Sequence, residues 1–307
     1  MPDDIVFVVN PASANGSTRK RWPEIAHQAA EAGLVGPALL SEGPGQIADL
    51  TRRACEDGAR LVVAVGGDGT VNEAVNGLMG VGPERRAELA TIPRGTGKDF
   101  ARSFGIPADV AKALDVARDG STRTVDAGRA TFVEWDGSPA ESYFANFAGA
   151  GISGAVAARA NASSKALGGK VAFFRATTAV FMRWQNTDYE VQIDGARRSG
   201  RMLEVVAAIG DQLAGGMRLA PEADPADGLF DIVLIGDATK LDFVRTLPRI
   251  YRGTYLPHPR AEVVRGRRLQ IETATPLPIA LDGEQPGTTP AVFEIVPGAL
   301  RLRVPAD

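Results

Sequence analysis

The sequence predicts an α/β protein of two domains: a doubly wound parallel sheet over residues 1–127, then a mainly antiparallel β-sandwich over residues 128–307. Strand and helix patterns alternate along the first part, which is typical of a parallel sheet with helices on both faces. Short strands with Asp-Gly turns fill the second part, which is typical of antiparallel pairing. The C-terminal end could pack back on the first domain.

Apolar runs and helical spacing predict the individual elements. In the first domain we expect strands at 5–9, 61–65 and 89–92 and helices at 20–32, 46–56, 72–78 and 110–118. In the second domain we expect helices at 154–167, 171–184 and 241–251, and a hairpin that joins 189–193 to 202–209 through an Asp-Gly turn. The sequence contains no internal repeat.

Composition excludes several classes of protein. One cysteine, Cys55, rules out an internal disulfide framework, and two histidines, His27 and His258, cannot build a histidine-rich metal site. A metal would therefore need oxygen ligands. The formal charge of −3, from 34 basic and 37 acidic side chains, argues against nucleic-acid binding. The first residues lack a targeting pattern, and Arg175 and Arg183 interrupt the longest apolar stretch, so we expect a cytoplasmic protein.

The most informative segment is Gly66–Thr70, read Gly-Gly-Asp-Gly-Thr, between a buried strand and a helix. Glycine permits close approach of a ligand to the backbone, and the helix offers unpaired N–H groups to an anion. Asp68 beside phosphates would act through a cation such as Mg²⁺. The alternative is a tight turn with Asp68 as an N-cap.

Two more polar loops follow predicted strands, at 10–17 and 93–99. Parallel strands end at one edge of their sheet, and ligands of such sheets bind beyond that edge. Three polar loops at consecutive strand ends therefore predict a nucleotide-binding domain.

These segments resemble the bacterial diacylglycerol kinase-like lipid kinases, a family that also includes sphingosine and ceramide kinases. The resemblance covers nearly the whole chain and rests on Asn10-Pro11, 66–73, 93–102, Val125-Asp126, 220–228 and Asp282-Gly283-Glu284. The Gly-Gly-Asp-Gly-Thr motif alone is shared with NAD kinases. Its continuation Val71-Asn72-Glu73 and the later Asp-Gly-Glu are similar to the lipid-kinase branch.

The resemblance implies an enzyme that uses ATP and Mg²⁺ in a cleft between the domains. The positions that match the family's ATP contacts are Asn10, Pro11, Ala12, Ser13, Ala14, Ser41, Gly67, Asp68, Gly69, Thr70, Val71, Asn72, Glu73 and Thr96. Asp99 and Asp126, with Asp68, match acidic positions around the metal and the cleft. Each of these carboxylates could instead be an ordinary turn or cap residue.

The family also implies two roles for carboxylates in the second domain. Asp282 would be the general base for the lipid hydroxyl, with Glu284 orienting it or sharing a metal; the alternative is a plain Asp-Gly β-turn. Asp224 and Asp227, with the carbonyl of Leu229, would hold a structural Mg²⁺; the alternative is a solvated loop.

Two other motifs do not predict nucleotide sites. The G-x-G-x-x-G pattern at 149–154 lies outside the parallel-sheet region, so we expect it to pack a helix against the sandwich. Gly97-Lys98 lacks the leading glycine of a P-loop, and Asp99 replaces its Ser or Thr.

A lipid acceptor requires access to a membrane surface. Arginines and aromatic residues alternate between Lys240 and Arg268, so we expect peripheral membrane association; the alternative is a solvated basic face. Three positions, Ala14, Lys98 and Ser153, depart from the residues that the family often has. The expectation is thus a lipid kinase acting on a lipid alcohol such as diacylglycerol, with homo-oligomers possible. The alternatives are a NAD kinase and a non-catalytic nucleotide- or lipid-sensing pseudokinase.

Overall fold

The computed structural model describes residues 4–95, 97–161 and 178–306. The chain forms two compact units. Unit 1 comprises Met1–Val125 and Gly298–Asp307, and unit 2 comprises Asp126–Pro297. The last ten residues thus belong to unit 1. Parts of the expected helices 154–167 and 171–184, and Thr96 among the predicted ATP contacts, lie outside the described residues.

Unit 1 is built on a parallel sheet. Its strands are β1 (Ile5–Val9), β2 (Ala38–Leu40), β3 (Leu61–Gly66), β4 (Glu88–Pro93) and the end of β14 (Gly287–Val304). They lie in the order β2-β1-β3-β4-β14, and every neighbouring pair is parallel. Every residue of β3 is buried, which explains its unbroken apolar sequence. The predicted parallel sheet is confirmed, although β2 was not predicted.

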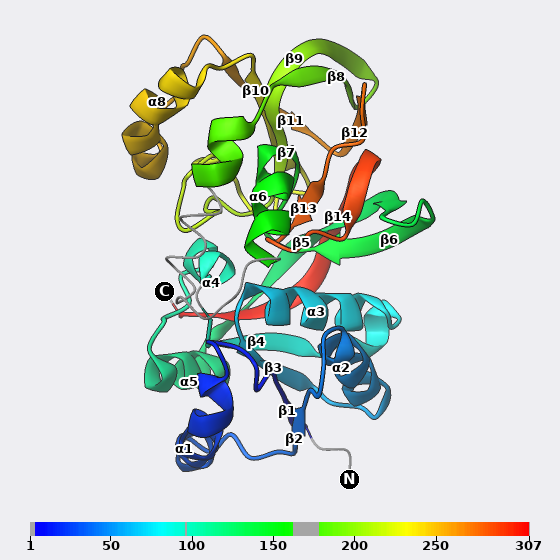
Figure 1. Ribbon diagram of the computed structural model, residues 1–307. Helices are drawn as coiled ribbons and strands as arrows, with labels where there is room; N and C mark the ends of the chain where they lie inside the picture. The colour runs from blue at the N-terminus through cyan, green and yellow to red at the C-terminus, as the bar shows by residue number, and fades with distance from the viewer. Residues whose placement is uncertain (1–3, 96, 162–177, 307) are drawn as a thin grey trace. The chain divides into compact units, whose positions relative to one another are not determined.

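Helices cover both faces of this sheet, as predicted for a doubly wound domain. They are α1 (Ser17–Glu31), α2 (Gln46–Glu56), α3 (Asp68–Met79), α4 (Asp99–Ser103), α5 (Val110–Asp119) and a 3₁₀ turn η1 (Pro83–Arg85). Ala29 of α1 and Leu114 of α5 pack with Phe7 and Val63 on one face. Figure 1 shows α2 and α3 together on the opposite face, where the two helices contact each other.

Unit 2 is a mainly antiparallel β-sandwich, as predicted. Its strands are β5 (Ser121–Glu134), which begins in unit 1, β6 (Pro139–Phe144), β7 (Phe147–Gly151), β8 (Thr187–Ile193), β9 (Ala196–Ala208), β10 (Phe230–Gly236), β11 (Ala261–Gly266), β12 (Arg268–Thr273), β13 (Ile279–Leu281) and the first part of β14. β9 pairs antiparallel with β8 over residues 196–202, and with β7 and β10 on its two edges over residues 204–208. Its alternating side chains feed two cores, because Val205 packs with Phe144 and Val206 packs with Tyr255.

The described helices of unit 2 are α6 (Ile152–Asn161) and α8 (Lys240–Arg252), and residues 178–183 are also helical. α6 follows β7 directly, and a Cβ at Gly154 would lie 2.1 Å from the carbonyl oxygen of Pro278. The G-x-G-x-x-G pattern therefore allows α6 to pack closely, as we expected. Within the described segments, every helix is too short or too polar to cross a membrane.

Candidate active site

The three polar loops of unit 1 lie together at the carboxyl edge of its sheet. Asn10, after β1, donates from Nδ2 to Oγ1 of Thr70, after β3, at 3.1 Å. The backbone N–H of Arg94, after β4, donates to the carbonyl of Gly66. A Cβ on Gly95 would lie 2.5 Å from Cα of Gly67, so these loops approach as closely as only glycine permits. Residues predicted from separate motifs are thus neighbours.

The first loop exposes the N-terminus of α1. Ala14, Asn15 and Gly16 have φ of 51°, 55° and 78°, so three successive residues are left-handed. Asn10 Oδ1 accepts the N–H of Ala12 at 3.0 Å and holds the start of the loop. No side chain caps α1 at Gly16. Backbone carbonyls of the loop accept its first N–H groups instead, from Ser17 to Ala14, from Thr18 to Ser13 and from Arg19 to Pro11. The helix dipole still places partial positive charge at this end, which favours an anion nearby.

The second loop opens α3 in the same manner. Gly67 is the N-cap, without a side-chain cap bond, and Asp68 is the first helical residue. The Asp68 carboxylate instead accepts N–H groups from the third loop, Asp99 at 3.2 Å and Phe100 at 3.3 Å. Asp68 therefore caps α4, the next helix along this edge, rather than its own helix. This bond joins two of the predicted acidic residues directly.

The oxygen ligands near these loops suit a hard cation. Asp68 and Asp99 both supply carboxylates, which Mg²⁺ prefers in company with phosphate oxygens. Asp99 is buried and also pairs with Arg102 at 2.7 Å. The residues fit a Mg²⁺ ion brought with a triphosphate, because Asp68 and Asp99 lie on adjoining segments that a hydrogen bond from the Asp99 N–H to the Asp68 carboxylate joins.

Arg94 is a residue of this edge that the sequence analysis missed as a site. Its Nη2 donates to Oγ of Ser17, the first residue of α1, at 3.2 Å. Its Nε is buried and has no hydrogen-bond partner among the described residues. Burial, and then repulsion by Arg21, lower the pKa of Arg94. A partly desolvated guanidinium beside a helix N-terminus is suited to bind phosphate. Its place directly after β4 was the available sequence signal.

Ser41 and Glu73 lie beside β2 and α2. Ser41 is buried and its backbone N–H donates to the carbonyl of Val9. The carboxylate of Glu73 accepts the N–H of Ile47 at 3.0 Å, near the N-terminus of α2. Glu73 therefore ties α3 to α2 and positions the helix that carries the second loop.

In unit 2, Asp282 lies in a two-residue turn and accepts three backbone hydrogen bonds. Asp282 and Gly283 have φ of 50° and 90°, so the backbone forms the Asp-Gly turn that was the alternative prediction. The carboxylate accepts N–H groups from Ala145 at 2.8 Å and from Asn146 and Phe147 at 2.9 Å each. These bonds fix the orientation of the carboxylate. Glu284, at the end of the turn, is exposed.

Asn146 contributes a second polar group beside Asp282. Its Nδ2 donates to the carbonyl of Gln212 at 2.8 Å. Its Oδ1 is buried and has no hydrogen-bond partner among the described residues. A buried acceptor without a donor is unfavourable unless a water or ligand supplies one. The sequence analysis did not identify Asn146, and its only signal was a polar residue between two apolar strands.

A second Asp-Gly turn in unit 2 has the same construction as the Asp282 turn. Asp194 has φ of 46° and Gly195 has φ of 91°. The Asp194 carboxylate accepts the N–H groups of Arg267 and Arg268, each at 2.9 Å. This turn joins β8 to β9 and lies on the surface. The bonding pattern of Asp282 is therefore also used in this protein for structure alone.

The predicted structural metal ligands lie on one turn before β10. Asp224 and Asp227 each accept, at Oδ1, the N–H of the residue two positions later, Ala226 at 3.1 Å and Leu229 at 2.9 Å. Arg265 forms an ion pair with Oδ2 of Asp227. Two carboxylates with a backbone carbonyl fit Mg²⁺ chemically. Arg265 is a competing source of positive charge for Asp227.

Asp126 holds the same turn from β5. Its Oδ2 accepts the N–H of Gly228 at 2.8 Å, and its own N–H donates to the carbonyl of Pro225. The side chain is buried. The structure thus places Asp126 with Asp224 and Asp227, within unit 2. Among the described residues, no three His, Cys, Asp or Glu side chains cluster as metal ligands.

Glu204 on β9 is a buried carboxylate that the sequence analysis missed. It accepts the backbone N–H of Ser153 at 2.6 Å and its hydroxyl at 2.8 Å, at the start of α6. Burial raises the pKa of Glu204 to about 7, although the bonds from Ser153 oppose that shift. A Cβ on Gly149 would lie 2.8 Å from Glu204 Oε1, so the glycine leaves space for this carboxylate. Ser153 is therefore part of a structural cap.

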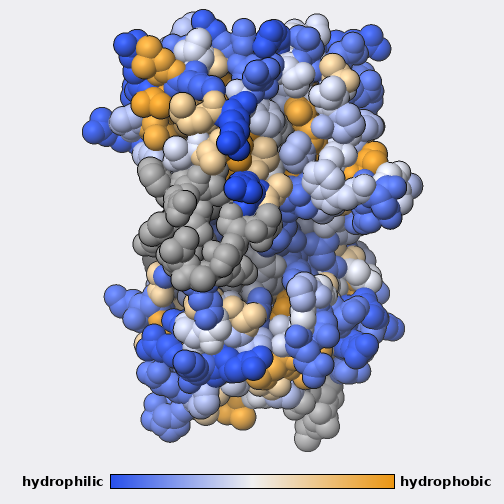
Figure 2. Space-filling model, viewed as in Figure 1, coloured by the Kyte–Doolittle hydropathy of each residue, from blue (hydrophilic) through white to orange (hydrophobic). Residues whose placement is uncertain are grey.

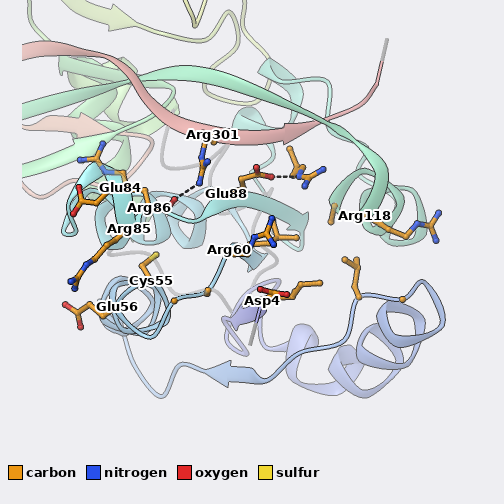
Figure 3. Close-up of a pocket in the computed structure, with 18 residues that line it drawn as sticks. Asp4, Cys55, Glu56, Arg60, Glu84, Arg85, Arg86, Glu88, Arg118 and Arg301 are labelled. Carbon is orange, nitrogen blue, oxygen red and sulfur yellow. Dashed lines mark hydrogen bonds and ion pairs between the residues drawn. The ribbon is translucent and has the colours of Figure 1, made fainter. Parts of the chain in front are cut away.

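A pocket of about 680 Å³ lies at the other edge of the unit 1 sheet, where the strands begin (Figure 3). Its arginines are largely engaged. Arg303 pairs with Glu88 at 2.7 Å, and Arg301 donates to the carbonyl of Arg86 at 2.8 Å, as the dashed lines show. The lining includes none of the residues predicted to contact a nucleotide. The candidate active site is therefore the carboxyl edge, rather than this pocket.

Comparisons with known proteins assign the chain to a family. Residues 4–130 match the diacylglycerol kinase catalytic domain, and residues 146–304, more than half of the chain, match the YegS C-terminal NAD kinase beta sandwich-like domain. The diacylglycerol kinase of Staphylococcus carnosus (strain TM300) is 26% identical over 301 residues, which cover 98% of this chain and 95% of the relative. The diacylglycerol kinase of Bacillus subtilis (strain 168) is 27% identical over 288 residues, which cover 94% and 91%.

Solved structures share the fold. A crystal structure of a diacylglycerol kinase from Bacillus anthracis str. Sterne has a TM-score of 0.79 and 24% identity, covering 98% of this chain and 97% of that chain. Yeast NADH kinase complexed with NADH has a TM-score of 0.56 and 13% identity, covering 98% and 82%. From the two matching domains, the chain belongs to the bacterial diacylglycerol kinase-like family of lipid kinases.

Proposed function

We propose that the protein is a lipid kinase that transfers the γ-phosphate of ATP, with Mg²⁺, to the hydroxyl of a lipid alcohol such as diacylglycerol. The observation that carries this proposal is the convergence of three polar loops at the carboxyl edge of unit 1, in a chain whose relatives are named diacylglycerol kinases. Because the substrates are ATP and a membrane lipid, we place the reaction at the cytoplasmic surface of a membrane.

Unit 1 would bind the nucleotide. Phosphoryl transfer depends on positioning and on stabilising charge, rather than on covalent chemistry by the protein. The starts of α1 and α3 would attract the phosphates through their helix dipoles, and Arg94 would offer a guanidinium. Asp68 and Asp99 would hold the Mg²⁺ ion, which neutralises charge on the phosphates.

Unit 2 would supply the acceptor chemistry. Asp282, held in place by hydrogen bonds from three backbone N–H groups, would accept the proton of the lipid hydroxyl as the hydroxyl oxygen attacks the γ-phosphate. Glu284 would orient the hydroxyl or the base. Asn146 Oδ1, which lacks a donor, would accept a hydrogen bond from an ordered water or the substrate.

Two alternative functions can be distinguished from a lipid kinase by experiment. A NAD kinase is favoured by the shared fold of yeast NADH kinase. A pseudokinase is favoured by Lys98 in the third loop and by Ala14, which adopts a left-handed conformation that glycine adopts more easily.

The test is phosphoryl transfer by the purified full chain. Labelled ATP and Mg²⁺ are supplied with a total lipid extract in one reaction and with NAD or NADH in another, and products are identified by mass spectrometry. We expect label in a lipid monophosphate, none in NADP or NADPH, and no transfer when EDTA removes the metal. Label in the dinucleotide would establish a NAD kinase. ATP binding without transfer to any acceptor would establish the pseudokinase.

A further inference from the structure

Helix α8 of unit 2 carries apolar residues on two faces. Ile250 is 3% exposed and packs with Tyr255 in the core, with Phe243 beside this cluster. Yet Leu241 and Val244 are each 55% exposed. A surface helix normally has one apolar stripe and a polar opposite face. The second apolar face of α8 therefore needs an explanation beyond folding.

The exposed apolar residues of α8 form one stripe. At 100° per residue, Leu241, Val244, Pro248 and Tyr251 fall within an arc of about 80°, and all four are exposed. Met182, whose carbonyl accepts a hydrogen bond from Lys240 at the start of the helix, is also 63% exposed. We call Leu241, Val244, Pro248 and Tyr251 the α8 stripe.

The charges beside the stripe are positive and largely unpaired. Arg245 and Arg252 lie within about 40° of Leu241 on the helix and have no ion-pair or hydrogen-bond partner in the part of the chain that is described. The acidic residue of the helix, Asp242, is engaged in the capping box with Thr239 and lies 3.7 Å from Arg260. The stripe is therefore bordered by positive charge that its own acidic residue does not neutralise.

The helix is stably folded before anything binds to it. The Thr239 capping box closes its start, and Gly253 in the left-handed conformation ends it. The carbonyl of Ile250 accepts the N–H of Arg218, which ties the helix to unit 2. Binding through the stripe would therefore not require the helix to fold, and little ordering entropy would be lost.

We propose that the α8 stripe is the surface by which this protein docks on an anionic lipid bilayer. An amphipathic helix binds a bilayer by lying in the interfacial plane, with apolar side chains at the boundary of the acyl chains and basic side chains at anionic headgroups. Leu241, Val244 and Tyr251 supply the first group, and Arg245 and Arg252 supply the second. Figure 2 shows hydrophobic surface over α8 beside strongly hydrophilic residues. This inference rests on the proposed lipid kinase activity, which gives docking a purpose. Its test does not depend on that activity, because it measures vesicle binding.

The charge pattern favours a bilayer over a second copy of the chain. In a symmetric dimer through this stripe, the same patch would face itself, and Arg245 and Arg252 would approach their own counterparts. Like charges at an interface disfavour association. An anionic bilayer instead offers both an apolar interior for the stripe and negative headgroups for the arginines.

The first test compares two matched pairs of apolar substitutions in the full chain. Leu241→Ser/Val244→Ser removes a leucine and a valine from the stripe, and Val35→Ser/Leu40→Ser removes the same pair from exposed positions of unit 1. Binding to vesicles of 70% phosphatidylcholine and 30% phosphatidylglycerol is measured by co-sedimentation without nucleotide. We expect the first variant to bind at least about tenfold more weakly and the second to bind like the wild type.

The second test addresses charge. Arg245→Gln/Arg252→Gln is compared with Arg53→Gln/Arg60→Gln, two exposed arginines of unit 1 without ion-pair partners in the described segments. We expect the first pair to lose about 25-fold in affinity for the anionic vesicles, at about fivefold per arginine, and the control to lose little. Equal binding of the wild type to pure phosphatidylcholine would overturn the role of anionic lipid.

The outcomes separate this inference from the proposed function. Unchanged vesicle binding by both α8 variants, or no binding by the wild type, overturns docking even if diacylglycerol in detergent is phosphorylated. Loss of binding by the α8 variants supports docking even if no lipid is phosphorylated. A wild-type dimer in light scattering that Leu241→Ser/Val244→Ser dissociates would show that the stripe binds a second copy, and would also overturn it. Circular dichroism and thermal melting check that each variant is folded.

Discussion

The carboxyl edge of unit 1 and the Asp282 turn of unit 2 differ in the charge that they present. At the carboxyl edge, α1 and α3 begin with the positive ends of their helix dipoles and without side-chain caps, and the Arg94 guanidinium lies beside the start of α1. At the turn, Asp282 already accepts three N–H groups. The carboxyl edge is suited to bind the anion of a ligand. The turn instead holds the carboxylate of Asp282 in a fixed position. This difference matches the two requirements of phosphoryl transfer, a phosphate site and an oriented acceptor group.

The Asp194 turn shares the backbone geometry and hydrogen bonding of the Asp282 turn. Both turns have positive φ at both central residues, and both carboxylates accept consecutive N–H groups. Hydrogen bonding alone therefore does not distinguish a catalytic from a structural aspartate. The two differ in surroundings, because Asp282 is partly buried beside Asn146 and Asp194 is exposed. That difference allows a controlled experiment.

The largest expected effect is that of Asp282→Asn. Loss of a general base lowers turnover by about 10²- to 10⁴-fold. The substitution also weakens the three N–H bonds, which lowers the free energy of unfolding by roughly 1–3 kcal/mol. Turnover is measured at saturating ATP, and stability by urea titration, so that only folded protein is compared.

The matched control for this variant is Asp194→Asn. It removes bonds of the same kind from a turn of the same type, so it should destabilise the protein with turnover per folded molecule unchanged. If both variants lose stability and both retain turnover, Asp282 is an anchor for residues 145–147 and the proposed base is wrong.

The next largest expected effect is on the pH dependence of stability and concerns the buried carboxylate of Glu204. Like Asp282, Glu204 accepts hydrogen bonds from a neighbouring segment, in this case from an N–H and an O–H group. Its pKa in the folded protein is raised from 4.5 to about 7 by burial. The folded state therefore retains a proton that the unfolded chain loses, and stability falls as pH rises from about 4.5 to 7. The expected loss is roughly 3 kcal/mol, because each pKa unit corresponds to about 1.4 kcal/mol.

Glu204→Gln removes this titration while keeping a similar shape. The variant should match the wild type near pH 4, below the unfolded pKa, and exceed its unfolding free energy near pH 8, as measured by urea titration at both values. Glu190→Gln, on an exposed position of the neighbouring strand β8, should leave the slope unchanged. An identical pH slope in Glu204→Gln and the wild type would show that another group is responsible.

Substitution of Arg94 tests whether the carboxyl edge of unit 1 binds phosphate. If its guanidinium binds phosphate, Arg94→Gln should weaken ATP binding about 10- to 100-fold, the range typical of a charge-assisted hydrogen bond. Isothermal titration calorimetry measures the dissociation constant directly. Arg53→Gln serves as a control for loss of a positive charge from the surface of unit 1. Equal ATP affinity in both variants would exclude Arg94 from the phosphate site.

The part of the candidate site that the sequence could predict depended on how far apart in the chain the interacting residues lie. The loops of unit 1 follow their strands directly, so the motifs at Asn10 and Gly66–Thr70 identified the carboxyl edge without any long-range information. Contacts between residues far apart in the sequence could not be predicted. Arg94 meets Ser17, 77 residues away, and Glu204 meets Ser153, 51 residues away. No local pattern specifies such pairs, because they exist only after the chain folds.

Missed elements have equally physical reasons. β2 spans Ala38–Leu40 with two of its three residues exposed, so it lacks both the length and the buried run that predict a strand. α4 spans Asp99–Ser103 and starts where Asp68 accepts its first N–H groups. Its start therefore depends on a residue 31 positions earlier in the chain.

The smallest expected effect concerns Ala14, at the start of the left-handed run in the first loop. A left-handed alanine costs about 1–2 kcal/mol, and glycine avoids that cost but has more freedom in the unfolded chain. Ala14→Gly should therefore raise the free energy of unfolding by at most about 1 kcal/mol, whereas Ala12→Gly, where φ is not positive, should lower it. Urea titration measures both, and calorimetry gives their ATP affinities. A gain in stability with a loss of ATP affinity would show that Ala14 stiffens the loop for its anion, which the pseudokinase alternative does not predict.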